Sequence, residues 1–562
     1  MRKYINYVIL WVVLTLAACT PANDWNPVSG GDNLTADPSW ACTGWIGAAN
    51  GVLDIGTGSE FRAYVNTYGL RVQADGDFGV TATISADADN LAAFSLVGKL
   101  GVGNWWNETN KLDVGLENGS VVVYFYDGSS FMPRVKQTFP VDGLSGQVEL
   151  ELRRVGSTLV VRANGKEAGQ LPDPGILPDG WAYFGASVRP NNTLHIHKLS
   201  IIAPPDSAGV AILTELDSDY TPTDPPLRDL ADARGIYIGG AVEPQHLRCD
   251  PVYGEVLGRE FNILVTENAF KFYAIHPEAE QYTFGGADTI VEFAEAHGMK
   301  VRGHTLLWYQ SMPAWIEDAA FTPEQWEQVI HDHITTIVGR YKGRVAYWDV
   351  LNEAISDSAV AGGPLRQTVW SDGLGADFID KAFTWAHEAD PDALLFYNDY
   401  GAEGMGAKSD QVYTLVKGLL ERGVPVHGVG LQMHLTIGGA PKPEDVQRNI
   451  QRLGELGLQV HITEMDIRLP VNASDNLFTT QANMYREYLS VCLAEKNCTA
   501  FVLWGFTDRY SWIPNFEPGS DHALIFDKMY RPKPAYFALR DALTIPKSLG
   551  PEDFGASCNC DL

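Results

Sequence analysis

The chain has 562 residues, enough for two or three domains that each bury a core. Hydrophobic residues make up 45% and charged residues 20% of it, which excludes a collagenous or largely disordered chain. The formal net charge of −29 at pH 7 argues against nucleic acid and anionic membranes as partners, because their phosphates would repel the protein, and it favours a neutral substrate.

The N-terminus has the features of an export signal. Two basic residues precede an apolar run from Tyr7 to Leu16, and the sequence Leu-Ala-Ala-Cys ends at Cys19. The run is too short to span a bilayer, so we predict a signal peptide over residues 1–18. Its last four residues resemble a bacterial lipobox. This implies cleavage before Cys19, acylation of its thiol, and a lipid-anchored protein exported to the bacterial cell envelope or surface, with the lipid as its only membrane contact. An ordinary signal peptide that contains a cysteine is the alternative.

After a predicted tether over residues 19–39, hydrophobic residues recur at every second position, as in a β-strand. Val148, Leu150 and Leu152 alternate with charged residues, and Asn164-Gly165 is typical of a type I′ hairpin turn. No long helical period interrupts this region. We therefore predict an all-β sandwich over residues 40–203, which resembles a concanavalin-like or laminin-G-like jelly roll in its pattern only.

Two tryptophans suggest a role for this all-β domain. Trp105 and Trp106 lie in a loop rich in glycine and asparagine, where they would present aromatic faces to a polysaccharide. A spacer or partner-docking role is the competing interpretation.

The pattern changes beyond a proline-rich stretch, which we predict to be a linker over residues 204–227. Over residues 228–546, strands alternate with helices, and the segment Thr322 to Tyr341 begins with a capping box and carries an apolar face. Helices that stop at glycine and lead directly into strands predict a parallel sheet. The α/β class follows, with a (β/α)8 barrel and a C-terminal tail over residues 547–562. The eight expected strands lie near Gly235, Phe261, Val301, Val345, Leu394, Val426, Gln459 and Ala500.

The cysteines indicate an oxidising compartment, because six remain when Cys19 is set aside. Cys492 and Cys498 flank a short turn and are the disulfide candidates. The partners of the others stay open: Cys42, Cys249, Cys558 and Cys560. None of the spacings is typical of a metal site, so we expect no metal.

Two glutamates occupy the positions where such a barrel carries its catalytic groups, the C-terminal ends of the strands. The fourth predicted strand ends in WDVLNEA and places Glu353 there, and the seventh ends in HITEMDI and places Glu464 at the same height. Two carboxyl groups that face one cleft are what glycoside hydrolysis requires.

Seven motifs, one at each of seven strand ends, extend this pattern. They are VTENAFK from Val265, GHTLLW from Gly303, WDVLNEA from Trp348, FYNDY from Phe396, GLQMH from Gly430, ITEMDI from Ile462 and WGFTDRYSW from Trp504. With them, residues 224–543 resemble a glycoside hydrolase family 10 endo-β-1,4-xylanase.

The resemblance implies endo-hydrolysis of xylan or xylo-oligosaccharides by a retaining mechanism without a cofactor. Glu464 would be the nucleophile, and Glu353 would be the acid and then the base. Esterification of Glu464 removes its negative charge, which lets Glu353 ionise and accept a proton from water.

The resemblance also implies a set of binding residues. His434 and Asp466 would orient the nucleophile, and Asn398 and Tyr400 would lie on the leaving-group side. The residues expected to bind sugar are Glu267, Asn268, Lys271, His304, Trp308, Asn352, Gln432, His434, Trp504 and Trp512.

The sequence departs from the family pattern after Trp308. Members commonly have Trp-His-x-Gln there, but this chain has Trp308-Tyr309-Gln310, which leaves the detail of that subsite open. Two other functions remain as alternatives: a β-glycosidase of the same clan that acts on another β-glucan, and a non-catalytic glycan-binding surface lipoprotein.

Overall fold

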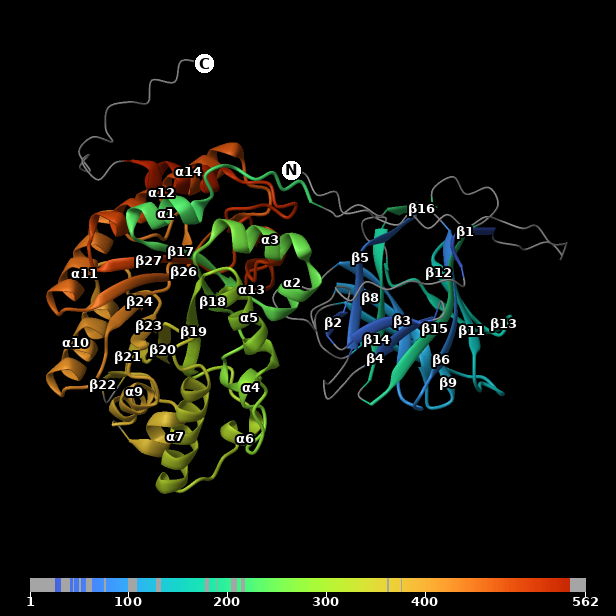
Figure 1. Cartoon of the computed structure of the whole chain (residues 1–562), viewed down its shortest axis with the longest axis horizontal. Helices are drawn as coiled ribbons and strands as arrows, with labels where there is room; N and C mark the ends of the chain where they lie inside the picture. Colours follow the sequence, from blue (N-terminus) through green and yellow to red (C-terminus); the bar gives the residue numbers. More distant parts are fainter. Residues whose placement is uncertain are drawn as a thin grey trace, which may run out of the picture. The chain divides into compact units, whose positions relative to one another are not determined.

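The computed structural model divides into two compact units, Met1–Asp217 and Ser218–Leu562 (Figure 1). The boundary falls inside the proline-rich stretch. The structure describes residues 26–31, 41–43, 45–49, 52–56, 63–74, 77–99, 109–127, 133–176, 181–189, 191–203, 210–213, 218–360, 363–375 and 377–545.

The first unit consists of two antiparallel sheets. In one sheet the strand order is β13-β12-β11-β6-β15-β4-β3, with β1 paired to β15; in the other it is β10-β9-β8-β7-β14-β5-β16, with β2 paired to β5. The strands are β1 Asn26–Gly31, β2 Ala41–Thr43, β3 Trp45–Ala49, β4 Val52–Gly56, β5 Ala63–Ala74, β6 Phe78–Ala86, β7 Ala92–Lys99, β8 Thr109–Glu117, β9 Ser120–Asp127, β10 Val135–Pro140, β11 Val148–Val155, β12 Thr158–Ala163, β13 Lys166–Pro172, β14 Trp181–Val188, β15 Thr193–Ala203 and β16 Val210–Leu213.

One apolar core joins the two sheets. Leu150 and Val161 of the first sheet and Phe94 and Val123 of the second belong to the same buried cluster. The alternation seen in the sequence is the cause, because successive side chains of a strand point to opposite faces. The hairpin turn at Asn164-Gly165 is confirmed, since both residues have positive φ.

The all-β unit extends beyond its predicted bounds. Strand β1 lies in the range predicted as tether, and β16 lies in the range predicted as linker. Both are short strands that pair with distant partners, β15 and β5. Such non-local pairing leaves no signal in a short stretch rich in glycine or proline.

The second unit is a closed barrel of eight parallel strands. The strand order is β24-β23-β20-β19-β18-β17-β27-β26, and a pairing between β24 and β26 closes it. All eight predicted strands are confirmed: β17 Tyr237–Val242, β18 Ile263–Thr266, β19 Lys300–Leu307, β20 Tyr347–Asn352, β23 Leu394–Asp399, β24 Gly428–Leu431, β26 Gln459–Pro470 and β27 Cys498–Leu503. Short strands flank the barrel mouth: β21 Ile355–Val360, β22 Gly363–Leu365, β25 His434–Thr436 and β28 Ser520–Asp521.

Helices surround the strands, as Figure 1 shows. The predicted capping box is present at Thr322, where α7 begins with Gln325 as its partner. The helices are α1 Leu227–Arg234, α2 Pro244–Cys249, α3 Pro251–Glu260, α4 Phe272–Ile275, α5 Gly285–Ala296, α6 Ala314–Glu317, α7 Pro323–Arg340, α8 Val369–Leu374, α9 Phe378–Ala389, α10 Ala407–Glu421, α11 Pro443–Glu455, α12 Asp475–Ala494, α13 Ile513–Phe516 and α14 Pro534–Thr544, with a 3-10 turn at Asp508–Tyr510. Among the described residues, none of these helices has the length and apolar character needed to cross a membrane.

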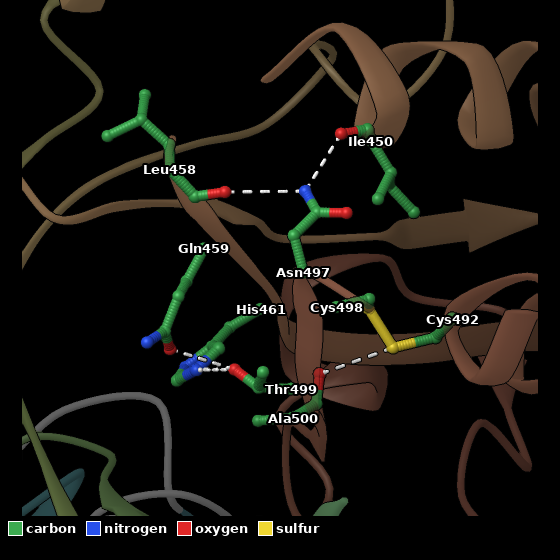
Figure 2. Close-up of a disulfide and its surroundings, with 9 residues drawn as sticks. All are labelled: Ile450, Leu458, Gln459, His461, Cys492, Asn497, Cys498, Thr499 and Ala500. Atoms are coloured by element: carbon green, nitrogen blue, oxygen red, sulfur yellow. Dashed lines mark hydrogen bonds between the residues drawn. A yellow bond between two sulfur atoms is a disulfide. The ribbon is translucent and has the colours of Figure 1, made fainter. Parts of the chain in front are cut away.

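The predicted disulfide is present in the barrel. Figure 2 shows Cys492, near the end of α12, bonded to Cys498 at the start of β27. Beside it, the Asn497 side chain donates hydrogen bonds to the carbonyl oxygens of Ile450 and Leu458, 2.9 and 3.3 Å away. The turn is therefore fastened to two further elements, α11 and the segment before β26.

Several predictions lie outside the described residues. They are the signal peptide with Cys19, the aromatic pair Trp105 and Trp106, Cys558 and Cys560, the tail over residues 547–562, and the side chains of Cys42 and Cys249.

Candidate active site

The two predicted catalytic glutamates lie at the C-terminal ends of barrel strands. Glu353 directly follows β20, and Glu464 lies in β26 two residues beyond Ile462, where the pairing of this strand with β24 ends. Both are buried, with exposed fractions of 7% and 4%. Glu353 also has a φ of +58°, a left-handed backbone conformation that non-glycine residues adopt at a cost and that is common at functional sites.

Three side-chain donors hold the Glu353 carboxyl group. Trp308 Nε1 donates to Oε2 over 2.9 Å, and Gln432 Nε2 donates to Oε1 over 2.9 Å. Asn352 Nδ2 is 3.2 Å from the same Oε1. The three donors come from different strand ends, so the carboxyl group is fixed from several directions.

Glu464 is held by an amide and an imidazole. Asn398 Nδ2 donates to Oε1 over 2.7 Å, and His434 Nε2 lies 3.0 Å from Oε2. Burial would raise the pKa of Glu464. The hydrogen bond from His434, the neighbouring His304 and the bond from Asn398 outweigh burial and hold the pKa below its ordinary value, so this carboxylate stays charged at neutral pH.

His434 lies between two carboxylates. Its Nδ1 is 2.9 Å from Asp466 Oδ2, which also accepts a hydrogen bond from Trp512 Nε1 over 2.8 Å. Burial would lower the pKa of His434, but the charge and hydrogen bond of Asp466, followed by those of Glu464, raise it to about 10. The imidazole is therefore protonated at neutral pH and donates from both ring nitrogens.

Side-chain amides join the two carboxyl groups. Asn398 Nδ2 donates to Asn352 Oδ1 over 2.8 Å as well as to Glu464, and its Oδ1 accepts from Thr463 over 2.7 Å. Gln432 Nε2 also lies 3.3 Å from Asn352 Oδ1. Asn398, expected on the leaving-group side, contacts Glu464 through its side chain and Glu353 through its backbone, where the Glu353 N–H donates to the Asn398 carbonyl oxygen over 2.8 Å.

A charged layer lies within the barrel beside this site. Asp349 accepts from Arg302 and from His304 Nδ1, the latter over 3.0 Å. Arg302 Nη1 lies 2.8 Å from His461 Nδ1. Burial and the Arg302 charge hold the pKa of His461 well below its ordinary value, so it is neutral and accepts from Arg302. These contacts fix His304, whose Nδ1 is 3.9 Å from Glu464 Oε1.

The predicted group Glu267, Asn268 and Lys271 forms a second cluster, in which Glu267 is buried and the other two are partly buried. Lys271 Nζ donates to Asn268 Oδ1 over 2.9 Å and lies 5.1 Å from the centre of the Trp308 ring and 5.8 Å from that of Trp504. Burial lowers the pKa of Lys271. Burial and the charge of Glu243 raise the pKa of Glu267 well above its ordinary value.

Glu243 belongs to this cluster and was missed in the sequence. It follows β17 and accepts from Asn268 Nδ2, and burial raises its pKa to about 7. The first predicted strand carried no motif, and a lone glutamate at its end gave no signal. Arg302 and Asp349 were missed too, although a charge inside an apolar strand is a usable signal of a buried ion pair.

Tyr309, which replaces the common histidine, contacts Gln310 and Arg366. Gln310 Nε2 donates to its hydroxyl over 2.6 Å, and the Arg366 guanidinium lies 4.2 Å from its ring centre. Arg366 Nε donates to the Glu353 carbonyl oxygen over 3.1 Å and Nη2 to Tyr400 over 3.4 Å. These residues form a wall next to Glu353.

In the part of the chain that the structure describes, no group of three or more His, Cys, Asp and Glu side chains is arranged to hold a metal ion. The side chains described above supply carboxyl, amide, imidazole, indole, ammonium and guanidinium groups. Such a set can transfer protons, attack an electrophilic carbon and bind hydroxyl groups.

Comparison with known proteins gives consistent matches. "Endo-1,4-beta-xylanase B" of Thermotoga neapolitana is 44% identical over 329 residues, which are 58% of this chain and 94% of that protein. "Exoglucanase XynX" of Acetivibrio thermocellus is 34% identical over 367 residues, 63% of this chain and 32% of that protein. The crystal structure of xylanase 10B from Thermotoga petrophila in complex with xylobiose is 45% identical, with a TM-score of 0.55, and covers 58% of this chain and 98% of that chain.

The family model for "Glycosyl hydrolase family 10" matches residues 226–542, the range that contains the barrel and both predicted catalytic glutamates. The chain therefore belongs to glycosyl hydrolase family 10.

Proposed function

We propose that the barrel hydrolyses β-1,4-xylosidic bonds inside xylan chains with retention of configuration. The strongest support is that the two buried glutamates at the mouth of the barrel have different hydrogen-bond donors. An indole and amides donate to Glu353, and an imidazole and an amide donate to Glu464. Membership of the family and the xylanases among its relatives support the substrate class.

The first step forms a covalent glycosyl-enzyme. An oxygen of the Glu464 carboxylate attacks the anomeric carbon and forms an ester bond. The bond from that carbon to the leaving oxygen breaks, and the leaving oxygen takes the proton of Glu353. His434 supports this role of Glu464, because its positive charge keeps the carboxylate ionised and its ring fixes the direction of attack.

The second step releases the sugar. Water attacks the same carbon on the face that the leaving group vacated and gives a proton to Glu353, while the bond to Glu464 breaks. Both carboxyl groups return to their starting states. The Asn352 amide, which contacts Glu353, Asn398 and Gln432, is rigid enough to bind the sugar 2-hydroxyl group in both steps.

The remaining predicted residues receive binding roles in this proposal. Glu267, Asn268 and Lys271 bind hydroxyl groups of a sugar on the glycone side, and His304 and Gln432 bind the sugar next to the scissile bond. Trp308, Trp504 and Trp512 supply aromatic walls, since sugar rings pack their C–H faces on indole.

Activity on isolated polysaccharides tests the substrate. We expect release of reducing ends and a rapid fall in viscosity with xylan, and at least roughly tenfold slower hydrolysis of soluble cellulose. The relative named as an exoglucanase makes a β-glucan the second candidate. Faster hydrolysis of cellulose without a fall in viscosity would replace the xylanase assignment with that candidate.

For the first unit we propose a concanavalin-like sandwich that binds polysaccharide. The support is its pair of sheets on one core and the tryptophan pair in the sequence. The isolated range should be retarded in gels that contain xylan or cellulose. Migration unchanged in both gels would mean that the unit is a spacer or a docking module.

We further propose that the protein is exported and anchored by lipid on Cys19, on the basis of its N-terminal sequence. Mass spectrometry of the native mature N-terminus should find an acylated Cys19. An unacylated start at another residue would refute the anchor.

A further inference from the structure

We infer that Glu403 is a positioning residue, which fixes a strained turn that sets the places of both catalytic carboxyl groups. The inference rests on the proposed function for its kinetic consequences only. It concerns the segment Gln432-Met433-His434, which connects β24 to β25.

In this turn, the residue that contacts Glu353 and the residue that contacts Glu464 are separated by one residue, Met433. The Gln432 side chain donates to Glu353, and the His434 side chain contacts Glu464. Met433 between them has a φ of +65° and is fully buried. A left-handed conformation at a non-glycine residue costs about 1 kcal/mol or more and persists only where the surroundings enforce it.

Hydrogen bonds enforce the turn from two sides. The Met433 carbonyl oxygen accepts from the Asp466 backbone N–H over 3.3 Å, and the Met433 N–H donates to Glu403 Oε1 over 3.2 Å. The Gln432 carbonyl oxygen accepts from the Glu464 backbone N–H over 3.0 Å. Of these partners, Glu403 is the one that acts through a side chain and lies on neither catalytic strand.

Glu403 is itself fixed. It lies in the loop after β23 and is 7% exposed, and its Oε1 also accepts from the Gly401 N–H over 3.0 Å. Asn449 of α11 donates to the Ala402 and Glu403 carbonyl oxygens over 2.8 and 3.1 Å. The backbone that carries Glu403 is therefore held by α11, and its carboxyl group is held by a backbone N–H of its own loop.

Loss of this acceptor has a specific consequence. The Met433 N–H would be buried without a partner, which costs more than the hydrogen bond is worth. The turn would relax toward negative φ and rotate the Gln432 and His434 side chains together. Both catalytic steps would then slow, although Glu403 lies behind the turn and is bonded to neither carboxyl group.

The test compares Glu403→Leu, which removes the acceptor, with Glu403→Gln, which keeps one carbonyl oxygen. The matched controls are the same substitutions at Glu260, a fully buried glutamate that accepts from the Leu227 N–H and from the Tyr220 and Tyr536 hydroxyls. The substrates are aryl β-xylobiosides with good and poor leaving groups. The second readout is the ring N–H signals of His434 in full-length protein labelled with ¹⁵N-histidine.

We expect Glu403→Leu to lower kcat on the order of 10- to 100-fold for both classes of leaving group, with KM little changed. A poor leaving group makes formation of the glycosyl-enzyme the limiting step, and a good one makes its hydrolysis limiting, so the two classes report on the two steps. Glu403→Gln should recover most of the rate and lose roughly fivefold, as expected for a weaker, neutral acceptor. The His434 signals should shift in both variants and remain unchanged in the Glu260 variants.

The inference is wrong if the Glu403 variants fold, keep kcat within twofold of wild type and leave the His434 signals unchanged. It is also wrong if the Glu260 variants lose as much rate as the Glu403 variants. If Glu403→Leu does not fold, Glu403→Gln alone tests the inference. A roughly fivefold loss of kcat with shifted His434 signals would support it, and an unchanged kcat with unchanged signals would refute it. An inactive wild type would refute the proposed function, while the His434 signals would still test the positioning role.

Discussion

Replacement of Asp466 by asparagine removes the negative charge that contributes most to the raised pKa of His434. The pKa of His434 is about 10, compared with an ordinary value of 6.5, a difference that corresponds to about 5 kcal/mol. Because the pKa is raised in the folded state, this stabilisation is fully present below about pH 6.5 and is lost as the pH rises through 10. Asp466→Asn keeps the shape of the site and changes this electrostatic contribution.

The magnitude follows from the geometry. A carboxylate in direct contact raises the pKa of a histidine by roughly 1 to 3, which corresponds to about 1.4 to 4 kcal/mol. Asp466 Oδ2 lies 2.9 Å from His434 Nδ1, and the His434 side chain is 18% exposed, so screening by solvent is limited. Asp466→Asn should therefore be less stable than wild type by this amount at about pH 6, and the difference should shrink toward pH 10.

Urea unfolding of both proteins, followed by tryptophan fluorescence at several pH values, measures this difference. Other groups that titrate near pH 10 are common to the two proteins and cancel in the comparison. A difference in free energy of unfolding that stays constant from about pH 6 to pH 10 would refute the electrostatic interpretation of the His434 site. Equal stability at every pH would refute it as well.

Three further substitutions give separate tests. Lys271→Met should raise KM for xylotriose roughly tenfold with little change in kcat, because it removes a charged donor proposed to bind a sugar hydroxyl; steady-state kinetics measures both constants. Glu353→Ala should lose more than 100-fold in kcat/KM for aryl xylobiosides with poor leaving groups and far less for those with good ones; with good leaving groups release of the sugar becomes limiting, and azide should restore that turnover. Cys498→Ser should lower the free energy of unfolding by roughly 2 kcal/mol in urea, because it opens the short loop closed with Cys492.

Each of these predictions has a contradicting result. An unchanged KM in Lys271→Met would remove that residue from the binding site. Equal losses for all leaving groups in Glu353→Ala would show that this residue is not the proton donor. A Cys498→Ser variant as stable as wild type, with a reductant also without effect on the wild type, would mean that the disulfide does not stabilise the barrel.

The position of the two glutamates was predictable because each motif lies at the end of a barrel strand. WDVLNEA and HITEMDI each follow a buried apolar run, and parallel strands bring their carboxyl ends to one face of a barrel, so Glu353 and Glu464 had to lie near each other. The eight strands themselves followed from the regular alternation of helix, glycine and strand.

The sequence could not predict the supporting residues Glu243 and Glu403, and the reason is physical. Glu243 and Glu403 are single acidic residues in loops, where the sequence cannot distinguish a buried acceptor from a solvated charge. Their partners, Asn268 and the Met433 N–H, are 25 and 30 residues away in sequence. Contacts of this kind are set by tertiary structure and not by any local period.

The identity of the nucleophile is the central claim, and trapping of the covalent intermediate tests it most directly. A 2-deoxy-2-fluoro xylobioside with a good leaving group should inactivate the enzyme, because the fluorine slows release of the sugar more than its attachment. Mass spectrometry of the digested protein should then find the sugar on Glu464. A label on any other residue, or inactivation that leaves no covalent sugar, would contradict the double-displacement mechanism proposed for this site.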